Sequence, residues 1–138
     1  MHPLDAVLFA CVHNAGRSQM AAAWFNKLCD PQKAVAISAG TQPGKSVHHG
    51  VAEAMNEVGI DLSTVRPRLL TSEVARRATL LVTMGCGDAC PYVPGMQKLD
   101  WTLEDPKGQS VETVRRIRDE IRQRILDLAK ERHWLLSR

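Results

Sequence analysis

The chain has few aromatic residues and no long apolar run. Both shortages limit the classes of protein to which it can belong. Phenylalanine, tryptophan and tyrosine make up 4% of its 138 residues, and no stretch approaches the roughly 18 apolar residues of a membrane span. No basic leader precedes the first apolar run, so no secretion signal is expected. The net charge is only +3, which does not imply nucleic-acid binding. We therefore expect a cytoplasmic protein that binds neither membranes nor nucleic acids.

Cysteine is also scarce. The four cysteines, at positions 11, 29, 86 and 90, do not make the disulfide scaffold of a small secreted protein. In a reducing compartment such residues are more often catalytic, redox-active or metal-binding. An apolar content of 44% and a charged content of 24% predict one ordinary globular domain over residues 1–138, with a monomer as the default.

Short apolar segments alternate with helical patterns along the chain. Strands are expected at residues 5–12, 34–38, 79–84 and 97–101, and helices at 18–29, 47–58, 72–77 and 111–129. This alternation predicts an α/β domain with a four-stranded parallel sheet and helices on both faces. The last helix should bury one stripe and expose its arginines. That stripe consists of Val111, Val114, Ile117, Ile121, Ile125 and Leu128.

The stretch after the first strand carries the strongest functional signal. Cys11 ends the strand, and Arg17 and Ser18 open an alanine-rich helix. A tight loop at a helix N-terminus presents several backbone N–H groups, and together with the helix dipole these groups favour a small anion. We therefore expect an oxyanion-binding loop made of Val12, His13, Asn14, Ala15, Gly16, Arg17 and Ser18.

Cys11 and Arg17 add reactive groups to this loop. Arginine offers a planar bidentate clamp for a tetrahedral oxyanion, and a positive environment favours the nucleophilic thiolate form of a cysteine. The alternative is that Cys11 is a buried thiol at a strand end, because free cysteine packs as a small hydrophobic residue. A Walker A loop is disfavoured because its Gly-Lys-Ser/Thr ending is missing.

The topology predicts where the remaining candidates lie. In a parallel sheet, functional residues gather beyond the carboxyl ends of the strands. Cys11 follows the first expected strand, Cys86 the third and Asp105 the fourth. We therefore expect these three residues to face one crevice.

Other candidate groups are assigned no metal. His48 and His49 have no cysteine or carboxylate partner at ligand spacing. We therefore expect them to lie at a solvated helix end and not in a metal site. Cys86 and Cys90 are interpreted as a redox pair, as half of a zinc site or as two packing cysteines, and the zinc site needs two further ligands, of which none follows. The redox pair is favoured. Cys29 is expected to be a bystander. No bound metal is predicted.

Several motifs resemble a known family. Cys-x5-Arg-Ser after the first strand, Ser38-Ala39-Gly40, the run 59–63 (Gly-Ile-Asp-Leu-Ser) and Asp105-Pro106 resemble the low-molecular-weight tyrosine phosphatases. Within that fold, residues 14–20, the segment Val82-Thr83-Met84 and the pair Cys86/Cys90 are similar to the thioredoxin-coupled arsenate reductases. The resemblance covers nearly the whole chain.

The resemblance implies a role for each site residue. Cys11 would attack arsenate held by the loop and Arg17, and Asp105 would protonate the departing oxygen. Asn14 and Ser18 would hold the loop and stabilise the thiolate. Cys86 would then attack the thiol–arseno adduct and release arsenite, and Cys90 would move the disulfide outward to an external reductant. Thioredoxin is expected as that reductant, in preference to a small thiol with glutaredoxin, because a resolving cysteine is present.

The sequence departs from the family pattern in two places. Only three residues separate Cys86 from Cys90, and on one helical turn their Cβ atoms would be about 5–6 Å apart, against roughly 3.5–4.5 Å in a disulfide. This segment must therefore be non-helical or refold to oxidise. Ala22 stands where some members hold potassium with a glutamate, so no strong potassium site is expected, although Ser38 and Asp61 remain.

Two other functions stay open on the sequence. A low-molecular-weight tyrosine phosphatase would use the same loop, although no aromatic residue flanks Asp105. A non-catalytic oxyanion or arsenite sensor would also use it, but would need a partner or DNA surface for which the sequence gives no sign.

Overall fold

A computed structural model describes residues 4–85 and 95–137 of the chain. The element order is β1 (Asp5–Cys11), α1 (Arg17–Leu28), β2 (Ala34–Gly40), α2 (His49–Glu57), α3 (Ser72–Arg76), β3 (Leu80–Thr83), β4 (Gln97–Asp100) and α4 (Val111–Arg132). All eight expected elements are present, and the largest difference is at the end of α4, expected at residue 129 and found at Arg132. No helix in the described ranges is both long and apolar enough to span a bilayer.

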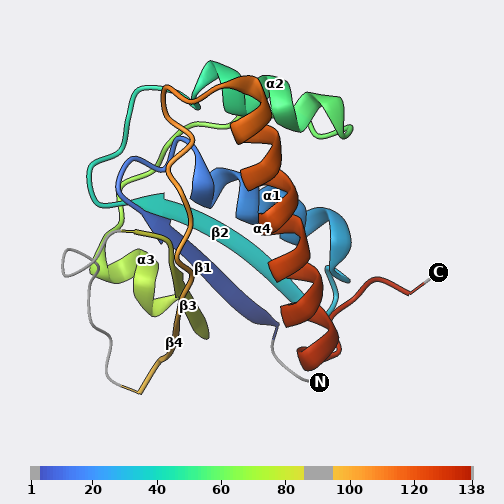
Figure 1. Cartoon of the computed structure of the whole chain (residues 1–138). Coiled ribbons are helices and arrows are strands. Elements are labelled where there is room, and N and C mark those ends of the chain that lie inside the picture. Colours follow the sequence, from blue (N-terminus) through green and yellow to red (C-terminus); the bar gives the residue numbers. More distant parts are fainter. Residues whose placement is uncertain (1–3, 86–94, 138) are drawn as a thin grey trace.

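The four strands form one parallel sheet, as predicted, and their order in it is β2-β1-β3-β4 (Figure 1). The apolar run of β1 lies at the centre of the sheet, where residues 7–10 are completely buried, as strands covered on both faces are. Cys11 pairs in register with Gly40, and Ala10 pairs with Thr83. The carboxyl ends of the three neighbouring strands therefore meet at one edge of the sheet.

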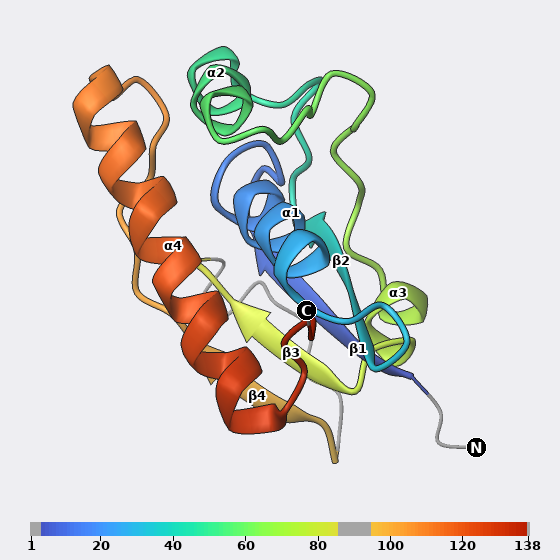
Figure 2. The same ribbon diagram turned by 90° about the vertical axis from the view of Figure 1, so that its right-hand side faces the viewer.

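Helices cover the two faces of the sheet unequally. Figure 2 shows α1 and α4 on one face and the short α3 on the other. The larger core joins the first face to α1, α2 and α4, and includes Phe9, Phe25, Met55 and Ile121. The smaller core lies under α3 and includes Leu8, Ala75 and Leu81. The chain thus crosses from β1 to β2 over one face and returns to β3 over the other, which leaves a crevice where the direction reverses.

The stripe of α4 is buried as predicted, except at its first residue. Val111 is 52% exposed, whereas the other five stripe residues are buried. The expectation that every arginine of α4 is solvated is wrong for Arg118, which is 8% exposed. Its guanidinium donates hydrogen bonds to the carbonyl oxygen of Ala54 (2.9 Å) and to Glu57 (2.8 Å). A buried arginine is tolerated there because its charge is paired and its stem packs between α2 and α4.

Glu57 at the end of α2 is the acceptor of a two-arginine cluster on α4. Arg115 Nη2 and Arg118 Nη1 lie 2.7 and 2.8 Å from its carboxylate oxygens. The hydrogen bonds from Arg115, and with them those from Arg118, lower the pKa of Glu57 from 4.5 to about 2. The charged form of Glu57 therefore ties α2 to α4.

We expect Glu57→Gln to lower the free energy of unfolding at pH 7, because a neutral amide cannot pair with both guanidinium groups. A carboxylate with a depressed folded-state pKa stabilises the fold above its unfolded-state pKa, and this contribution is lost as pH falls through the folded-state value. The difference between wild type and variant should therefore shrink from about pH 4.5 to about pH 2. Urea unfolding at a series of pH values measures it.

Glu131→Gln is the matched control, because Glu131 is an exposed glutamate on α4 with no ion pair recorded in the described part of the chain. It should change the unfolding free energy little at any pH. A Glu57→Gln effect that stays constant down to pH 2 would contradict the assignment.

Candidate active site

The loop after β1 has its carbonyl groups tied to a neighbouring segment. The carbonyl oxygens of residues 11, 12, 13 and 15 accept hydrogen bonds of 2.8–3.2 Å from backbone N–H groups of segment 41–48. For the N–H groups of residues 12–16, no acceptor is recorded among the described residues. Buried backbone donors are normally paired, so this arrangement leaves a row of donors for a ligand. An anion fits them, because α1 begins at Arg17 and its dipole adds positive potential at the same point.

Asn14 fixes the conformation of this loop. Its backbone is left-handed, with φ of 50°, a conformation that asparagine adopts more readily than most residues. Its buried side-chain oxygen accepts the backbone N–H of Arg68 at 2.8 Å and the Nε2 group of Gln19 at 3.1 Å. Because a backbone N–H can only donate, the oxygen of Asn14 must face Arg68, and its NH₂ group faces Ser18 at 2.8 Å.

The orientation of Asn14 determines that of Ser18. The Ser18 oxygen accepts a hydrogen bond from Asn14 and lies 2.8 Å from the sulfur of Cys11. The Ser18 oxygen has a second lone pair, so either group can donate to the other while Cys11 is a thiol, whereas a Cys11 thiolate can only accept and Ser18 then donates to it. A donor in that position stabilises a thiolate, and Cys11 is 3% exposed at the end of β1. The structure thus places the sulfur of Cys11 next to the row of loop amides.

Gly40 allows β2 to approach the loop closely. A Cβ atom built at this position would lie 2.5 Å from the carbonyl oxygen of Val12 and 2.9 Å from the nitrogen of Asn14. Both neighbours are backbone atoms that cannot move aside without moving the loop. Only a hydrogen atom fits at position 40.

Arg17 is held at the opposite side of the loop from three directions. Its Nη1 donates to the carbonyl oxygen of Leu103 at 3.2 Å, and its Nη2 lies 3.8 Å from the carboxylate of Asp105. Gly85, with φ of +109°, leaves room for the guanidinium, because a Cβ atom there would lie 2.6 Å from Nη1. The Arg17 side chain is 13% exposed, so its charge is held close to the loop and does not extend into solvent.

Asp105 lies at the rim of the same site. Its side chain is 50% exposed, and its Oδ1 accepts the backbone N–H of Lys107 at 3.0 Å, which fixes the turn. The next residue, Pro106, contacts Gly16 closely, since a Cβ atom on Gly16 would lie 2.9 Å from the proline ring. By contrast Asp100, a competing carboxylate, accepts a hydrogen bond from the hydroxyl group of Thr83.

The structure therefore brings the loop, Cys11, Arg17 and Asp105 to one edge of the sheet. Cys86 and Cys90 lie outside the described residues, and Gly85 beside Arg17 is the last described residue before them. Cys29 is buried, and burial raises the pKa of its thiol to about 11. A protonated buried thiol is unreactive, in agreement with the bystander prediction.

His48 is a neighbour of the site that the sequence did not indicate. Its backbone N–H donates to the carbonyl oxygen of Ala15 at 2.9 Å, and its ring would lie 3.4 Å from a Cβ atom on Gly16. Burial lowers the pKa of His48, while the charge of Asp105 opposes this shift. The solvated helix end expected for both histidines is found for His49, which is exposed and pairs with Glu53. No group of three His, Cys, Asp or Glu side chains suited to a metal occurs in the described ranges.

Gly40→Ala should weaken phosphate binding by about tenfold or more, because the new methyl group displaces the amides that would bind the anion. Isothermal titration calorimetry with inorganic phosphate measures this affinity. The control is Gly50→Ala in the first turn of α2, where a Cβ atom would meet nothing within 4 Å. This variant should bind phosphate as wild type does and gain up to about 1 kcal/mol of stability from helix propensity. Equal phosphate affinity in Gly40→Ala and wild type would contradict the role given to the loop amides.

The chain is similar to a known family and to several known proteins. Residues 6–133 match the family described as low molecular weight phosphotyrosine protein phosphatase. Arsenate reductase 2 of Staphylococcus saprophyticus is 37% identical over 123 residues, which cover 86% of this chain and 92% of that protein.

Solved structures give a similar result. The thioredoxin-dependent arsenate reductase of Corynebacterium glutamicum superposes with a TM-score of 0.81 at 40% identity over 94% of this chain. The chain spans only 62% of the length of that protein. An arginine phosphatase from Geobacillus stearothermophilus superposes with a TM-score of 0.76 at 27% identity, over 94% of this chain and 93% of that one. Proteins named as reductases and proteins named as phosphatases thus share this fold.

Proposed function

The chain belongs to the low-molecular-weight phosphotyrosine protein phosphatase family, and we propose that within it this protein is an arsenate reductase regenerated by thioredoxin. The observation that carries the proposal is the thiol of Cys11, which lies 2.8 Å from the hydroxyl oxygen of Ser18 beside a loop whose N–H groups have no acceptor among the described residues. The relatives named arsenate reductase support the choice of substrate.

In the first step the loop amides and Arg17 bind arsenate, and the Cys11 thiolate attacks the arsenic. A bond forms between Cys11 sulfur and arsenic, and one oxygen departs as water. Asp105 donates a proton to this oxygen, since its carboxyl group lies at the rim beside Arg17. Arsenic remains in the +5 state.

The second step supplies two electrons, which a hydrolase site does not. The Cys86 thiolate attacks the sulfur of Cys11, a Cys11–Cys86 disulfide forms, and the electron pair of the sulfur–arsenic bond leaves with arsenic as arsenite. Cys90 then attacks Cys86 and releases Cys11 as a thiol. Thioredoxin reduces the resulting Cys86–Cys90 disulfide, which balances the cycle.

A phosphatase is the second candidate, because the family name and the arginine phosphatase similarity point to it. Both candidates share the first step, attack by Cys11 on a bound tetrahedral oxyanion. They differ in the second, where a phosphatase transfers its adduct to water and no cysteine is oxidised. Cys86 and Cys90 favour the reductase, and their oxidation state decides between the two functions.

We expect Cys90→Ser to release one arsenite per chain and then stop, with Cys11 and Cys86 joined by a disulfide. The reason is that the variant retains both thiols of the reductive step but lacks the one that exports the disulfide. Wild type should cycle with thioredoxin, thioredoxin reductase and NADPH. Arsenite release and mass mapping of the disulfides after one turnover without reductant measure both results.

Cys29→Ser is the matched control and should cycle like wild type, whereas folded Cys11→Ser should release no arsenite. Continuous cycling of Cys90→Ser with thioredoxin would overturn the relay. Hydrolysis of p-nitrophenyl phosphate with no arsenite release by wild type would establish a phosphatase.

Asp105→Asn should slow formation of the adduct by about 10²-fold, the usual scale of general acid catalysis. Arsenate should still protect Cys11 from alkylation, because the amide does not remove the loop donors. Rapid-quench measurement of arsenite release gives the rate. Asp100→Asn is the comparison, and a larger effect there than at Asp105 would move the proton donor to Asp100. Asp88, the other competitor in the sequence, lies outside the described residues.

A further inference from the structure

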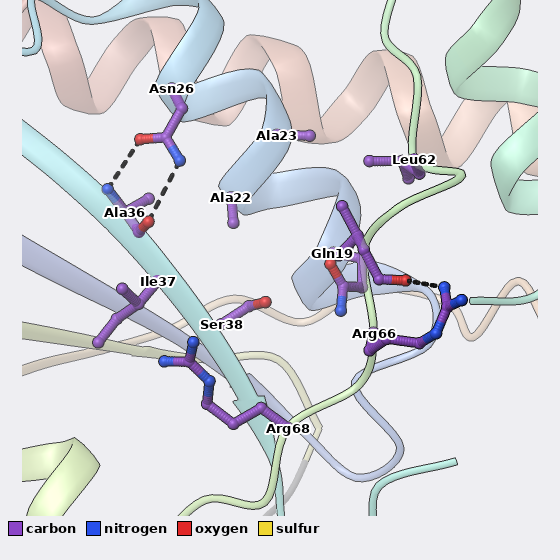
Figure 3. Close-up of a pocket in the computed structure, with 11 residues that line it drawn as sticks. Gln19, Ala22, Ala23, Asn26, Ala36, Ile37, Ser38, Leu62, Arg66 and Arg68 are labelled. Carbon is purple, nitrogen blue, oxygen red and sulfur yellow. Dashed lines mark hydrogen bonds between the residues drawn. The ribbon is translucent and has the colours of Figure 1, made fainter. Parts of the chain in front are cut away.

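A second polar pocket lies between α1, β2 and the segment that follows α2. It has a volume of about 240 Å³, and Figure 3 shows the side chains around it. None of its lining residues belongs to residues 11–18 or is Asp105, so it is separate from the active site. Its polar lining consists of Gln19, Asn26, Ser38, Arg66 and Arg68.

The charge of this pocket is positive and unbalanced. Arg66 and Arg68 line it, no acidic residue does, and neither arginine has an ion pair recorded in residues 4–85 and 95–137. The Asn26 amide is already engaged, since it bonds both the N–H and the carbonyl of Ala36. The hydroxyl group of Ser38 and the guanidinium of Arg68 therefore remain as donors for a ligand.

The segment that carries Arg66 and Arg68 is held in place by backbone hydrogen bonds. The Arg68 N–H donates to Asn14 at 2.8 Å, and the Arg68 carbonyl accepts the N–H of Gly40 at 2.8 Å. Pro67 restricts Arg66, the residue before it, to extended backbone conformations. The Arg66 guanidinium donates to the carbonyl oxygens of Ser63 and Val65, which folds its charge back onto the same segment.

We propose that this pocket is a second anion site, for a small molecule with a carboxylate or phosphate headgroup and a compact apolar body. Arg68 and Ser38 would bind the headgroup, because guanidinium pairs well with both anions. Leu62, Val65 and Ile37 supply the apolar wall. A cation is disfavoured here, since Ala22 lines the pocket without a carboxylate and Asp61 is bonded to its own turn at Ser63.

The pocket is connected to Cys11 by consecutive hydrogen bonds. Arg68 donates to Asn14 from one wall, and Gln19 donates to the carbonyl and the side-chain oxygens of Asn14 from another. Asn14 in turn orients Ser18, and Ser18 contacts Cys11. A ligand that shifts Arg68 or Gln19 therefore changes the position of the Ser18 hydroxyl group beside Cys11.

Isovalerate and inorganic phosphate are the probes, because isovalerate has the headgroup and the apolar body but not the tetrahedral shape that the active-site loop fits. Backbone NMR spectra should show isovalerate shifting the amides of Ser38 and Arg68 more than those of residues 15–17. Arg68→Gln should weaken this binding by about tenfold or more. Phosphate should shift both sets of amides in wild type, and in Arg68→Gln only those of the loop.

Arg77→Gln is the matched control, an exposed arginine at the end of α3 that removes the same charge. It should leave isovalerate binding unchanged. Saturating isovalerate should also change the rate of Cys11 alkylation by iodoacetamide by about fivefold in wild type, the lower end of usual coupling between sites. Folded Arg68→Gln should show no such change.

Shifts confined to the active-site loop would overturn the proposal. Equal loss of binding in Arg77→Gln and Arg68→Gln would do so as well, because it would reflect net charge alone. Shifts at Ser38 caused by potassium chloride and not by choline chloride would make the pocket a cation site. Because isovalerate binding needs neither arsenate nor the cysteine relay, this result is independent of the proposed function.

Discussion

The loop after β1 keeps its conformation through one buried amide, the side chain of Asn14. Its left-handed backbone turns the chain between β1 and α1, and its side chain joins this turn to Arg68, Gln19 and Ser18. Since an asparagine amide has distinct donor and acceptor ends, these partners fix its orientation. Because the Asn14 amide donates to Ser18, that orientation also holds the Ser18 hydroxyl group 2.8 Å from the sulfur of Cys11. The conformation of the loop and the hydroxyl neighbour of Cys11 are thus two results of the same constraint.

In the proposed mechanism, the groups that bind the anion are distinct from the thiol that attacks it, which explains how one site can serve two reactions. In this mechanism backbone amides and Arg17 bind a tetrahedral oxyanion, and Cys11 attacks it, whichever element stands at the centre of the anion. Only the fate of the adduct differs between hydrolysis and reduction. A second thiol that reaches the adduct before water converts the hydrolase mechanism into a two-electron reduction. This small difference accounts for the presence of proteins named phosphatase and proteins named reductase in one family.

Much of the fold was predictable because each element has a local signal. The apolar run at residues 5–11 and the stripe of α4 indicated a central strand and a packed helix, and Thr71 caps α3 as expected. The active-site loop was predictable because its spacing places Cys11 and Arg17 on either side of a helix N-terminus. The contribution of Arg68 was not predictable, because it acts through its backbone N–H, which every residue except proline has. Burial of Arg118 and the approach of His48 depend on packing between distant segments, which no local pattern encodes.

In the proposed mechanism the loop binds its anion through backbone atoms, so the side chains of the loop can diverge separately from the groups that bind. Asn14, Ala15 and Gly16 are buried and fixed by their neighbours, whereas the side chains of Val12 and His13 are only partly buried. The His13 Nδ1 atom lies 3.0 Å from the carbonyl oxygen of Gln42, in the segment to which the loop is tied. Val12 has no polar side-chain atom, so substitutions at position 12 can alter what surrounds the anion without removing a hydrogen bond that holds the loop. A lineage can explore new substrates at this position while the loop amides stay in place. Diversity of activity on this scaffold is then a matter of rim residues and accessory thiols, accumulated around an unchanged anion site.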